Sequence, residues 1–456
     1  MFDLVINNGN MADVKNGLFK KCNIGIKNGI IESISQTELT GIKTVDASGM
    51  VVSPGFIDIH MHEDQLHEDD GEKTIKEDIF KNMVLMGVTT CIGGNCGIRM
   101  DDIEGYFSTV DKQGISLNFG AYLGYSNLRE KIGANDNYKP LTKEEIEKVK
   151  NLIRIGLEAG ALGLSFGLEY TPGSTTNEMI EIAKILIEYP GKMMSAHYRY
   201  DANEGMEAIK ELIYISWVIG VPMQISHIGS CTAFGMMDES LRLLEKARSI
   251  GIDVMADCYP YNAFSTYIGT AVFDGDCFGR WGKDYDSILV SEGKYAGKYC
   301  TKEIFEYLRK NEPDTLVVAF VMDEKEVEKA LVSPLVMIAS DGLMHLGQGH
   351  PRAAGTFPRV LFLYVKEKKS MPLLTALSKM TAMPAARLGL TKKGNLNLGN
   401  DADIVIFDPD KIQDKADFEH PSLVPEGIVF VIVNGIIVAE EGILTGEKPG
   451  KAIRFG

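Results

Sequence analysis

The stretch PGFIDIHMH, residues 54–62, is a short apolar run that ends in two histidines, His60 and His62. Apolar residues, with a phenylalanine and two isoleucines among them, dominate it, which predicts a buried strand over residues 56–60. Seven more runs of this kind follow along the middle of the chain. They occupy residues 89–93, 118–124, 161–166, 193–197, 222–227, 252–259 and 336–341.

Longer segments lie between these runs. Apolar residues recur in them at three- and four-residue spacing, which predicts amphipathic helices over residues 143–158, 203–218 and 240–249. Eight strands that alternate with helices predict an α/β fold, a (β/α)8 TIM-like barrel over residues 54–390. Residues 267–317 are too long for an ordinary connection, so we expect an insertion there that covers the active-site mouth.

Both ends of the chain have the pattern of β structure with tight turns. Asn-Gly, the favoured hairpin dipeptide, interrupts apolar runs at residues 16–17 and 28–29, and again at residues 434–435. Neither end has enough strands to bury a face alone. We therefore expect residues 1–53 and 391–456 to pair into one small β-sandwich domain.

The composition limits the partners of the protein. The 47 basic and 63 acidic residues give a net charge of −16, which repels phosphate backbones and anionic membranes. We therefore expect a small-molecule partner and neither nucleic acid nor membrane. The seven cysteines are scattered and odd in number, and the first residues do not resemble a signal peptide, so we expect a cytoplasmic protein without a disulfide framework.

Potential metal ligands stand at the ends of five predicted strands. His60 and His62 are two residues apart, so their side chains leave a strand on the same side. The other four follow further strands and are Cys96, His197, His227 and Asp341. Imidazole, thiolate and carboxylate ligands together are suited to Zn²⁺. The sequence therefore predicts a zinc site at the rim where the strands end.

Taken singly, each of these residues has a simpler explanation. A lone His-x-His is two polar residues at a strand end, and an isolated histidine is more often a hydrogen-bonded core residue. Cys96 could be a small buried apolar residue, as we expect for Cys91, and Asp341 in Ser-Asp-Gly could belong to a turn. The combination of all of them at successive strand ends favours the metal site.

Several motifs together resemble the amidohydrolase superfamily, and within it the N-acyl-D-amino-acid deacylase (D-aminoacylase) family. They are PGFIDIHMH at 54–62, GNCG at 94–97, SAHYR at 195–199, DCYPY at 257–261, SDGLMH at 340–345 and HPRAAGTFPRVL from residue 350. GNCG and HPRAAGTFPR are the most specific of these. The resemblance extends over nearly the whole chain, including the closing segment GNDADIVIFDPD.

The resemblance implies a ligand set and an activity. Cys96, His197 and His227 would hold one zinc ion tightly, and His60, His62 and Asp341 would flank a second, weaker metal position. The reaction would be hydrolysis of the N-acyl amide of a D-amino acid by metal-activated water, with Asp341 as general acid/base.

The resemblance also implies residues that bind the substrate carboxylate. These are Arg352, with Tyr259, Ser265 and Tyr170 as neighbouring donors, and a planar guanidinium is suited to a carboxylate. The chain departs from the family in having Gly229 where a lysine is frequent, two residues after His227.

Two other functions are compatible with parts of this pattern. A cyclic amidohydrolase of the hydantoinase or dihydroorotase kind would have the same rim histidines, but it would also have a metal-bridging lysine in the fourth strand, and residues 161–166 contain none. A scaffold that has lost its metals and its activity would not be expected to retain a ligand at every strand end.

Overall fold

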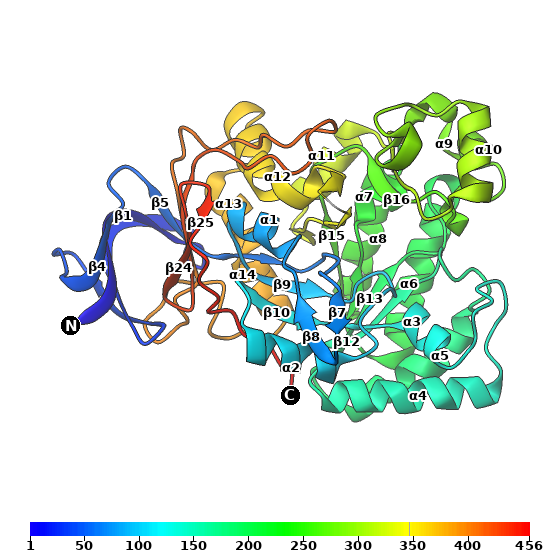
Figure 1. The fold of residues 1–456 in the computed structure, drawn as a ribbon, viewed down its shortest axis with the longest axis horizontal. Helices are drawn as coiled ribbons and strands as arrows, with labels where there is room; N and C mark the ends of the chain where they lie inside the picture. The colour runs from blue at the N-terminus through cyan, green and yellow to red at the C-terminus, as the bar shows by residue number, and fades with distance from the viewer. Residues whose placement is uncertain (346) are drawn as a thin grey trace.

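The computed structural model describes residues 1–345 and 347–456. Two runs of parallel strands form the centre of the molecule (Figure 1), and all eight predicted strands are present. One sheet has the order β10-β9-β6 and the other has the order β11-β12-β13-β14-β15-β19. These strands are β6 (Phe56–Asp58), β9 (Val88–Gly93), β10 (Asn118–Ala121), β11 (Leu123–Gly124), β12 (Gly163–Gly167), β13 (Met193–His197), β14 (Met223–Ile225), β15 (Val254–Cys258) and β19 (Val336–Ile338).

The two sheets meet at both of their ends. The backbone N–H of Leu162 donates to the carbonyl of Ala121 at 2.8 Å, next to the short break between β10 and β11. At the other end, the backbone N–H of Asp341 donates to the carbonyl of His60 at 2.8 Å. The backbone N–H of His62 donates to the carbonyl of Gly342 at 2.9 Å. The residues that follow β6 and β19 therefore lie side by side, although they are far apart in the sequence.

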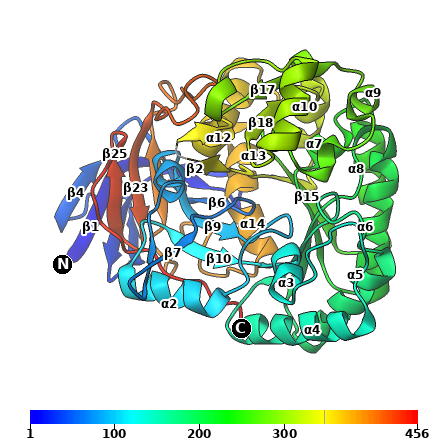
Figure 2. The same cartoon turned by 45° about the vertical axis from the view of Figure 1, so that its right-hand side comes forward.

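Helices connect the parallel strands and pack on their outer side (Figure 2). The predicted helix over 143–158 is confirmed as α4, where Thr142 and Glu145 form a capping box. The helix predicted over 203–218 is α6, which begins two residues later and ends one residue later, and the helix predicted over 240–249 is α8, which begins three residues earlier and ends at the same residue. The helices outside the insertion are α1 (Phe80–Leu85), α2 (Ile103–Gln113), α3 (Tyr125–Lys131), α4 (Lys143–Glu158), α5 (Thr176–Ala183), α6 (Gly205–Ile219), α7 (Ile228–Thr232), α8 (Met237–Ser249), α11 (Glu324–Val332), α12 (Arg352–Arg359), α13 (Leu373–Met380) and α14 (Ala382–Arg387).

The two chain ends join in one nine-stranded sheet, and buried side chains from both ends share one hydrophobic core cluster. β5 is the reason, because it pairs with β1 on one side and β22 on the other and so joins the ends edge to edge. The predicted Asn-Gly turns all connect neighbouring strands of this sheet. Its strands are β1 (Phe2–Asp13), β2 (Leu18–Lys27), β3 (Ile30–Ser35), β4 (Gly41–Asp46), β5 (Val51–Pro54), β22 (Ile404–Phe407), β23 (Ile428–Val433), β24 (Ile436–Glu440) and β25 (Ile443–Leu444).

The last residues of the chain leave this sheet, although the prediction placed them in it. Phe119 N–H donates to Lys451 at 3.0 Å, and Ile453 N–H donates back to Phe119. These bonds place the tail against β10, where it satisfies backbone groups of an otherwise unpaired strand edge.

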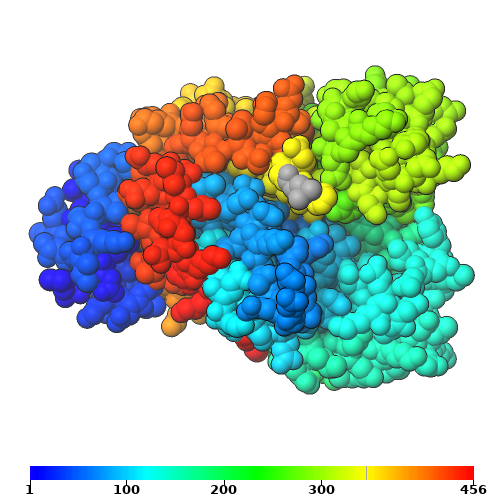
Figure 3. All heavy atoms as spheres, viewed as in Figure 1, coloured from blue at the N-terminus to red at the C-terminus, as the bar shows by residue number. Residues whose placement is uncertain are grey.

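The predicted insertion is a separate antiparallel sheet with two helices, and it forms a lobe of the surface (Figure 3). It begins slightly earlier and ends slightly later than 267–317. Its strands pair in the order β16-β18-β17. Its elements are β16 (Phe264–Tyr267), α9 (Cys277–Trp281), β17 (Ile288–Val290), α10 (Lys302–Asn311) and β18 (Leu316–Ala319).

Smaller elements complete the fold. They are the hairpins β7 (Leu66–Asp69) with β8 (Glu72–Ile75) and β20 (Met344–His345) with β21 (Gln348–Gly349), five 3-10 segments, and the π-helical segment η6 (Val360–Glu367) that continues α12. The 3-10 segments are η1 (Lys184–Glu188), η2 (Ala202–Glu204), η3 (Ala271–Phe273), η4 (Tyr285–Ser287) and η5 (Gly293–Tyr295). Within the described residues, none of the helices has both the length and the apolar content needed to cross a bilayer.

A buried ion pair between α3 and α5 generates a stability prediction. Arg129 Nη1 lies 3.2 Å from Glu178 Oε1, and both side chains are almost fully buried. We expect Arg129→Ala to lower the free energy of unfolding by about 3–5 kcal/mol, because Glu178 is left buried without its partner. Urea denaturation measures this.

The matched control is Lys112→Ala, which breaks a pair of exposed side chains with Glu72. It should leave the unfolding midpoint nearly unchanged, because exposed pairs contribute little. Equal shifts for the two variants would contradict the assignment.

Candidate metal centre

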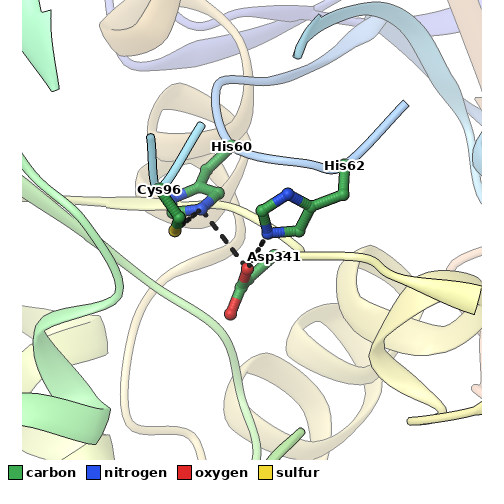
Figure 4. A group of neighbouring side chains, drawn as sticks. All are labelled: His60, His62, Cys96 and Asp341. Atoms are coloured by element: carbon green, nitrogen blue, oxygen red, sulfur yellow. Dashed lines mark hydrogen bonds and ion pairs between the residues drawn. The ribbon is translucent and has the colours of Figure 1, made fainter. Parts of the chain in front are cut away.

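All six predicted ligands lie at the same rim of the parallel strands. His60 and His62 follow β6, Cys96 follows β9, His197 ends β13, His227 follows β14 and Asp341 follows β19. The possible ligand atoms of His60, His62, Cys96 and Asp341 all lie within 4.8 Å of one another (Figure 4). The same limit holds for Cys96, His197 and His227, so Cys96 belongs to both groups.

Cys96 lies at the centre of this cluster. Its Sγ is 3.3 Å from Nε2 of His60 and 3.4 Å from Nε2 of His227. The backbone of Cys96 has φ of 55°, and His227 (32°) and Asp341 (48°) are also left-handed. Side chains are rarely held in this conformation unless the surroundings impose it, and such positions gather at functional sites.

Gly97 explains how the loop after β9 can place the thiol there. Its φ is 73°, and a Cβ at this position would lie 2.5 Å from the backbone nitrogen of Gly167. Only glycine combines this backbone angle with such a close approach to the last residue of β12. Close packing of this loop therefore explains why the last position of the Gly-Asn-Cys-Gly motif is glycine.

Three imidazoles are held from behind by hydrogen-bond acceptors. Nδ1 of His60 lies 3.0 Å from Asp257 Oδ1, and Nε2 of His197 lies 2.9 Å from Glu169 Oε2. Nδ1 of His227 lies 2.9 Å from the hydroxyl of Ser230, which donates its own proton to the carbonyl of His227. With a metal bound, these partners would keep the N–H on the far nitrogen, so the near nitrogen of each ring would direct its lone pair at the ion.

The near nitrogens of His197 and His227 are spaced so that both could contact one cation. Nδ1 of His197 and Nε2 of His227, the nitrogens on the near side of the two rings, are 3.1 Å apart. Two lone pairs at this separation repel each other unless a positive charge lies against both. Four imidazoles, one thiolate and one carboxylate form a donor set suited to zinc.

The pKa shifts of Cys96 and His60 agree with a role of the thiol as a metal ligand. Burial alone would raise the pKa of the Cys96 thiol, but the imidazoles of His60 and His227 hold that pKa well below its usual range. Burial alone would lower the pKa of His60, but Cys96, Asp257 and Asp341 raise it well above its usual range. The thiol is therefore stable as the thiolate, which is the form that binds metals.

Asp341 has two different neighbourhoods for its two oxygens. Oδ1 lies 3.1 Å from Nε2 of His62 and 3.3 Å from Nε2 of His60. Oδ2 forms an ion pair of 2.9 Å with Nη1 of Arg352. Burial would raise the pKa of Asp341, but Arg352, His227 and His60 lower it well below its usual range. Asp341 is thus an ionised carboxylate inside the site.

The predicted substrate-binding residues are near one another, but not all of them offer a donor. Arg352 stacks its guanidinium on the ring of Tyr259, 4.6 Å from the centroid, and its Nε has no hydrogen-bond partner among the described residues. The buried hydroxyl of Tyr259 also lacks one. Tyr170 packs its ring on His197, with the centroids 4.5 Å apart.

Ser265 differs from the expectation. It lies in β16, and its hydroxyl donates to the carbonyl of Val317 at 2.9 Å, so that proton is used within the insertion sheet. At Gly229, an added Cβ would lie 3.0 Å from the sulfur of Cys258. The missing lysine therefore leaves a buried, closely packed position rather than an opening.

A pocket of about 500 Å³ opens next to these groups. Its wall includes His62, His227, Asp341, Arg352 and Tyr170. The insertion contributes Ser265, Thr266, Tyr267, Gly269, Thr270, Ala271, Pro313 and Asp314 to the same wall. The predicted position of the insertion beside the active-site mouth agrees with this lining.

Sequence reasoning missed the residues that hold the imidazoles from behind. Asp257 stands near the end of β15, where a polar residue in a buried strand is the same signal that identified His197. Glu169 follows β12 by two residues and could have been found in the same way. Nothing in the sequence indicated the ion pair between Asp341 and Arg352.

Known proteins are similar to this chain over nearly its whole length. Residues 51–438 match the model of the amidohydrolase family. The chain is 33% identical to a D-aminoacylase of Alcaligenes xylosoxydans xylosoxydans, over 99% of this chain and 97% of that protein.

Two solved structures have the same fold over essentially their full length. One is a D-aminoacylase studied for the role of its binuclear metal centre, with a TM-score of 0.87, 29% identity and full coverage of both chains. The other is the N-acyl-D-glutamate deacylase of Bordetella bronchiseptica in complex with zinc and a phosphonate inhibitor. It has a TM-score of 0.87, 28% identity and 99% coverage of both chains.

Two buried cysteines, one inside β9 and one in the loop that follows it, test the central position of Cys96. We expect Cys96→Ala to lose bound zinc, because both ligand groups lose their only sulfur donor. Cys91→Ala should retain zinc, because Cys91 lies inside β9 and burial raises its pKa well above the usual range. Zinc content of the purified proteins measures this, and equal zinc content in the two variants would contradict it.

Proposed function

Because the chain belongs to the amidohydrolase family and gathers sulfur, imidazole and carboxylate donors at one rim, we propose that it hydrolyses N-acyl-D-amino acids with the help of zinc. The products are a carboxylate and the free D-amino acid. The observation that carries the proposal is the Cys96 thiolate between the imidazoles of His60 and His227, with the Asp341–Arg352 pair beside it.

We assign the tight metal position to Cys96, His197 and His227, and a second, weaker position to His60, His62 and Asp341 with Cys96 shared. The rear partners of His197 and His227 support the first set. The short contacts between Asp341 Oδ1 and the other two histidines support the second.

The arrangement also supports a closed (β/α)8 barrel as the core domain. Backbone hydrogen bonds join the residues after β6 to those after β19, and an isolated parallel bridge pairs Met61 with Gly342. We assign residues 54–390 to this barrel, with the insertion between β15 and β19, and the flanking segments to the terminal β domain.

The reaction needs a nucleophile, a group that transfers a proton and residues that bind the substrate. Zinc held by Cys96, His197 and His227 would lower the pKa of water toward neutrality and polarise the amide carbonyl. Asp341 is ionised, so its Oδ1 takes a proton from the attacking water while the new C–O bond forms. The same oxygen then delivers that proton to the departing nitrogen as the C–N bond breaks.

Arg352 is the group that binds the α-carboxylate of the substrate in this proposal. Its Nη1 already contacts Asp341, its Nη2 lies 3.4 Å from the carbonyl of Ser265, and its Nε is free to donate. The hydroxyl of Tyr259 has no hydrogen-bond partner among the described residues, and its ring stacks on the guanidinium. This hydroxyl offers a further donor. A carboxylate here lies beside the general base, so the scissile amide is held close to Asp341.

The cyclic alternative has less support. β12 spans Gly163–Gly167 and contains no lysine, and the anionic donor facing the imidazoles is the sulfur of Cys96. The 33% identical relative is named a D-aminoacylase. A scaffold without activity would not require an ionised Asp341. It would also not require the hydrogen-bond partners that orient His60, His197 and His227.

An assay with paired enantiomers tests the proposed activity. We expect the zinc-loaded protein to hydrolyse N-acetyl-D-amino acids at least about tenfold faster than the L forms, measured as kcat/KM. Hydantoin and dihydroorotate serve as controls and should not react. Turnover of the cyclic compounds alone, or a preference for the L forms, would contradict the proposal.

Asp341→Asn separates proton transfer from metal binding. We expect kcat to fall by about 10²–10⁴-fold, because the amide cannot accept a proton. The zinc held by Cys96, His197 and His227 should remain, so zinc content is measured on the same sample. Retention of near-normal kcat with zinc bound would rule out Asp341 as the general base.

A further inference from the structure

The insertion reaches the metal centre through a chain of charged contacts. Oε2 of Glu169 lies 2.9 Å from Nε2 of His197, and Oε1 of the same carboxylate lies 3.8 Å from Nη2 of Arg280. Arg280 belongs to α9 of the insertion, whereas Glu169 follows β12 of the barrel. A side chain of the insertion thus contacts the acceptor that holds a predicted metal ligand.

Arg280 lies between two buried carboxylates. Its Nε is 2.5 Å from Oδ1 of Asp201, whose Oδ2 accepts a hydrogen bond of 2.6 Å from the indole of Trp281. Among the described residues, no other lysine or arginine lies within ion-pair distance of Glu169 or Asp201. One guanidinium therefore balances two carboxylates that would otherwise repel each other away from water.

The position of this guanidinium is set by the core of the insertion. Nη2 donates to the carbonyl of Val272 at 2.7 Å. The neighbouring Trp281 is buried, and its ring packs 5.7 Å from that of Phe264 and 5.8 Å from that of Phe273. The insertion therefore holds Arg280 in one place, rather than leaving it to follow the carboxylates.

We propose that Arg280 is a positioning residue of the metal centre, which holds Glu169 against the far nitrogen of His197. With Glu169 in place, Nδ1 of His197 faces Cys96 and His227. Partners behind a metal-bound imidazole fix its tautomer and orientation. The insertion is thus part of the metal centre as well as part of the pocket wall. This inference depends on the proposed function only in that a metal binds at Cys96, His197 and His227.

Zinc affinity tests the proposal without any substrate. We expect Arg280→Met to weaken zinc binding by about 10–100-fold, measured by competition with a chromophoric chelator. The matched control is Arg309→Met, which breaks the ion pair with Asp274 elsewhere in the insertion. It should bind zinc like the wild type. Equal affinities for Arg280→Met and the wild type would overturn the proposal.

A double-mutant cycle with Glu169→Gln tests the route of the effect. If Arg280 acts through Glu169, adding Arg280→Met to Glu169→Gln should change zinc affinity by less than about twofold. Full additivity of the two losses would overturn the proposal. The visible spectrum of the cobalt(II)-loaded proteins should change in the same way for both single variants, because both alter the orientation of His197.

Arg280→Lys covers the case in which Arg280→Met folds poorly. It retains a positive charge between the carboxylates, and we expect zinc affinity within about threefold of the wild type, in keeping with the small cost of a retained ion pair. A loss as large as that of Glu169→Gln would contradict the role of the charge. If zinc binds as expected but N-acyl-D-amino acids are not hydrolysed, the proposed function fails while this inference stands.

Discussion

The buried sulfur of Cys96 lies between two imidazoles at 3.3 and 3.4 Å. A buried thiolate of this kind needs positive charge beside it, and imidazole lone pairs that face one another need a cation between them. The left-handed backbone at Cys96, the glycine that follows it and the acceptors behind His60, His197 and His227 all follow from this requirement. The site is built to hold a metal before any substrate arrives.

Much of this could be predicted from the sequence, because strand ends in a parallel fold share one rim. The runs that end at His60, His197 and His227 are short and apolar and stop at a polar residue. This pattern predicts where each strand lies and which side chain stands at its carboxyl end. Cys96 was separable from Cys91 by its glycine neighbours. The hairpins of the chain ends were predictable from Asn-Gly pairs.

Contacts between elements far apart in the chain were not predictable in this way. The ion pair of Asp341 with Arg352, and that of Arg280 with Asp201, depend on how loops pack on the rim. The single terminal sheet depends on β5, a four-residue strand whose two partners come from opposite ends of the chain. Local periodicity carries no information about such pairings. The insertion is the clearest case, since its length was predictable but its link to His197 was not.

The most direct test of the central claim is X-ray absorption at the zinc K edge of the zinc-loaded protein. The account predicts one sulfur ligand at about 2.3 Å together with imidazole nitrogens at about 2.0–2.1 Å. A zinc ion surrounded by nitrogen and oxygen alone would contradict the account, because the sulfur of Cys96 would then take no part in holding the metal.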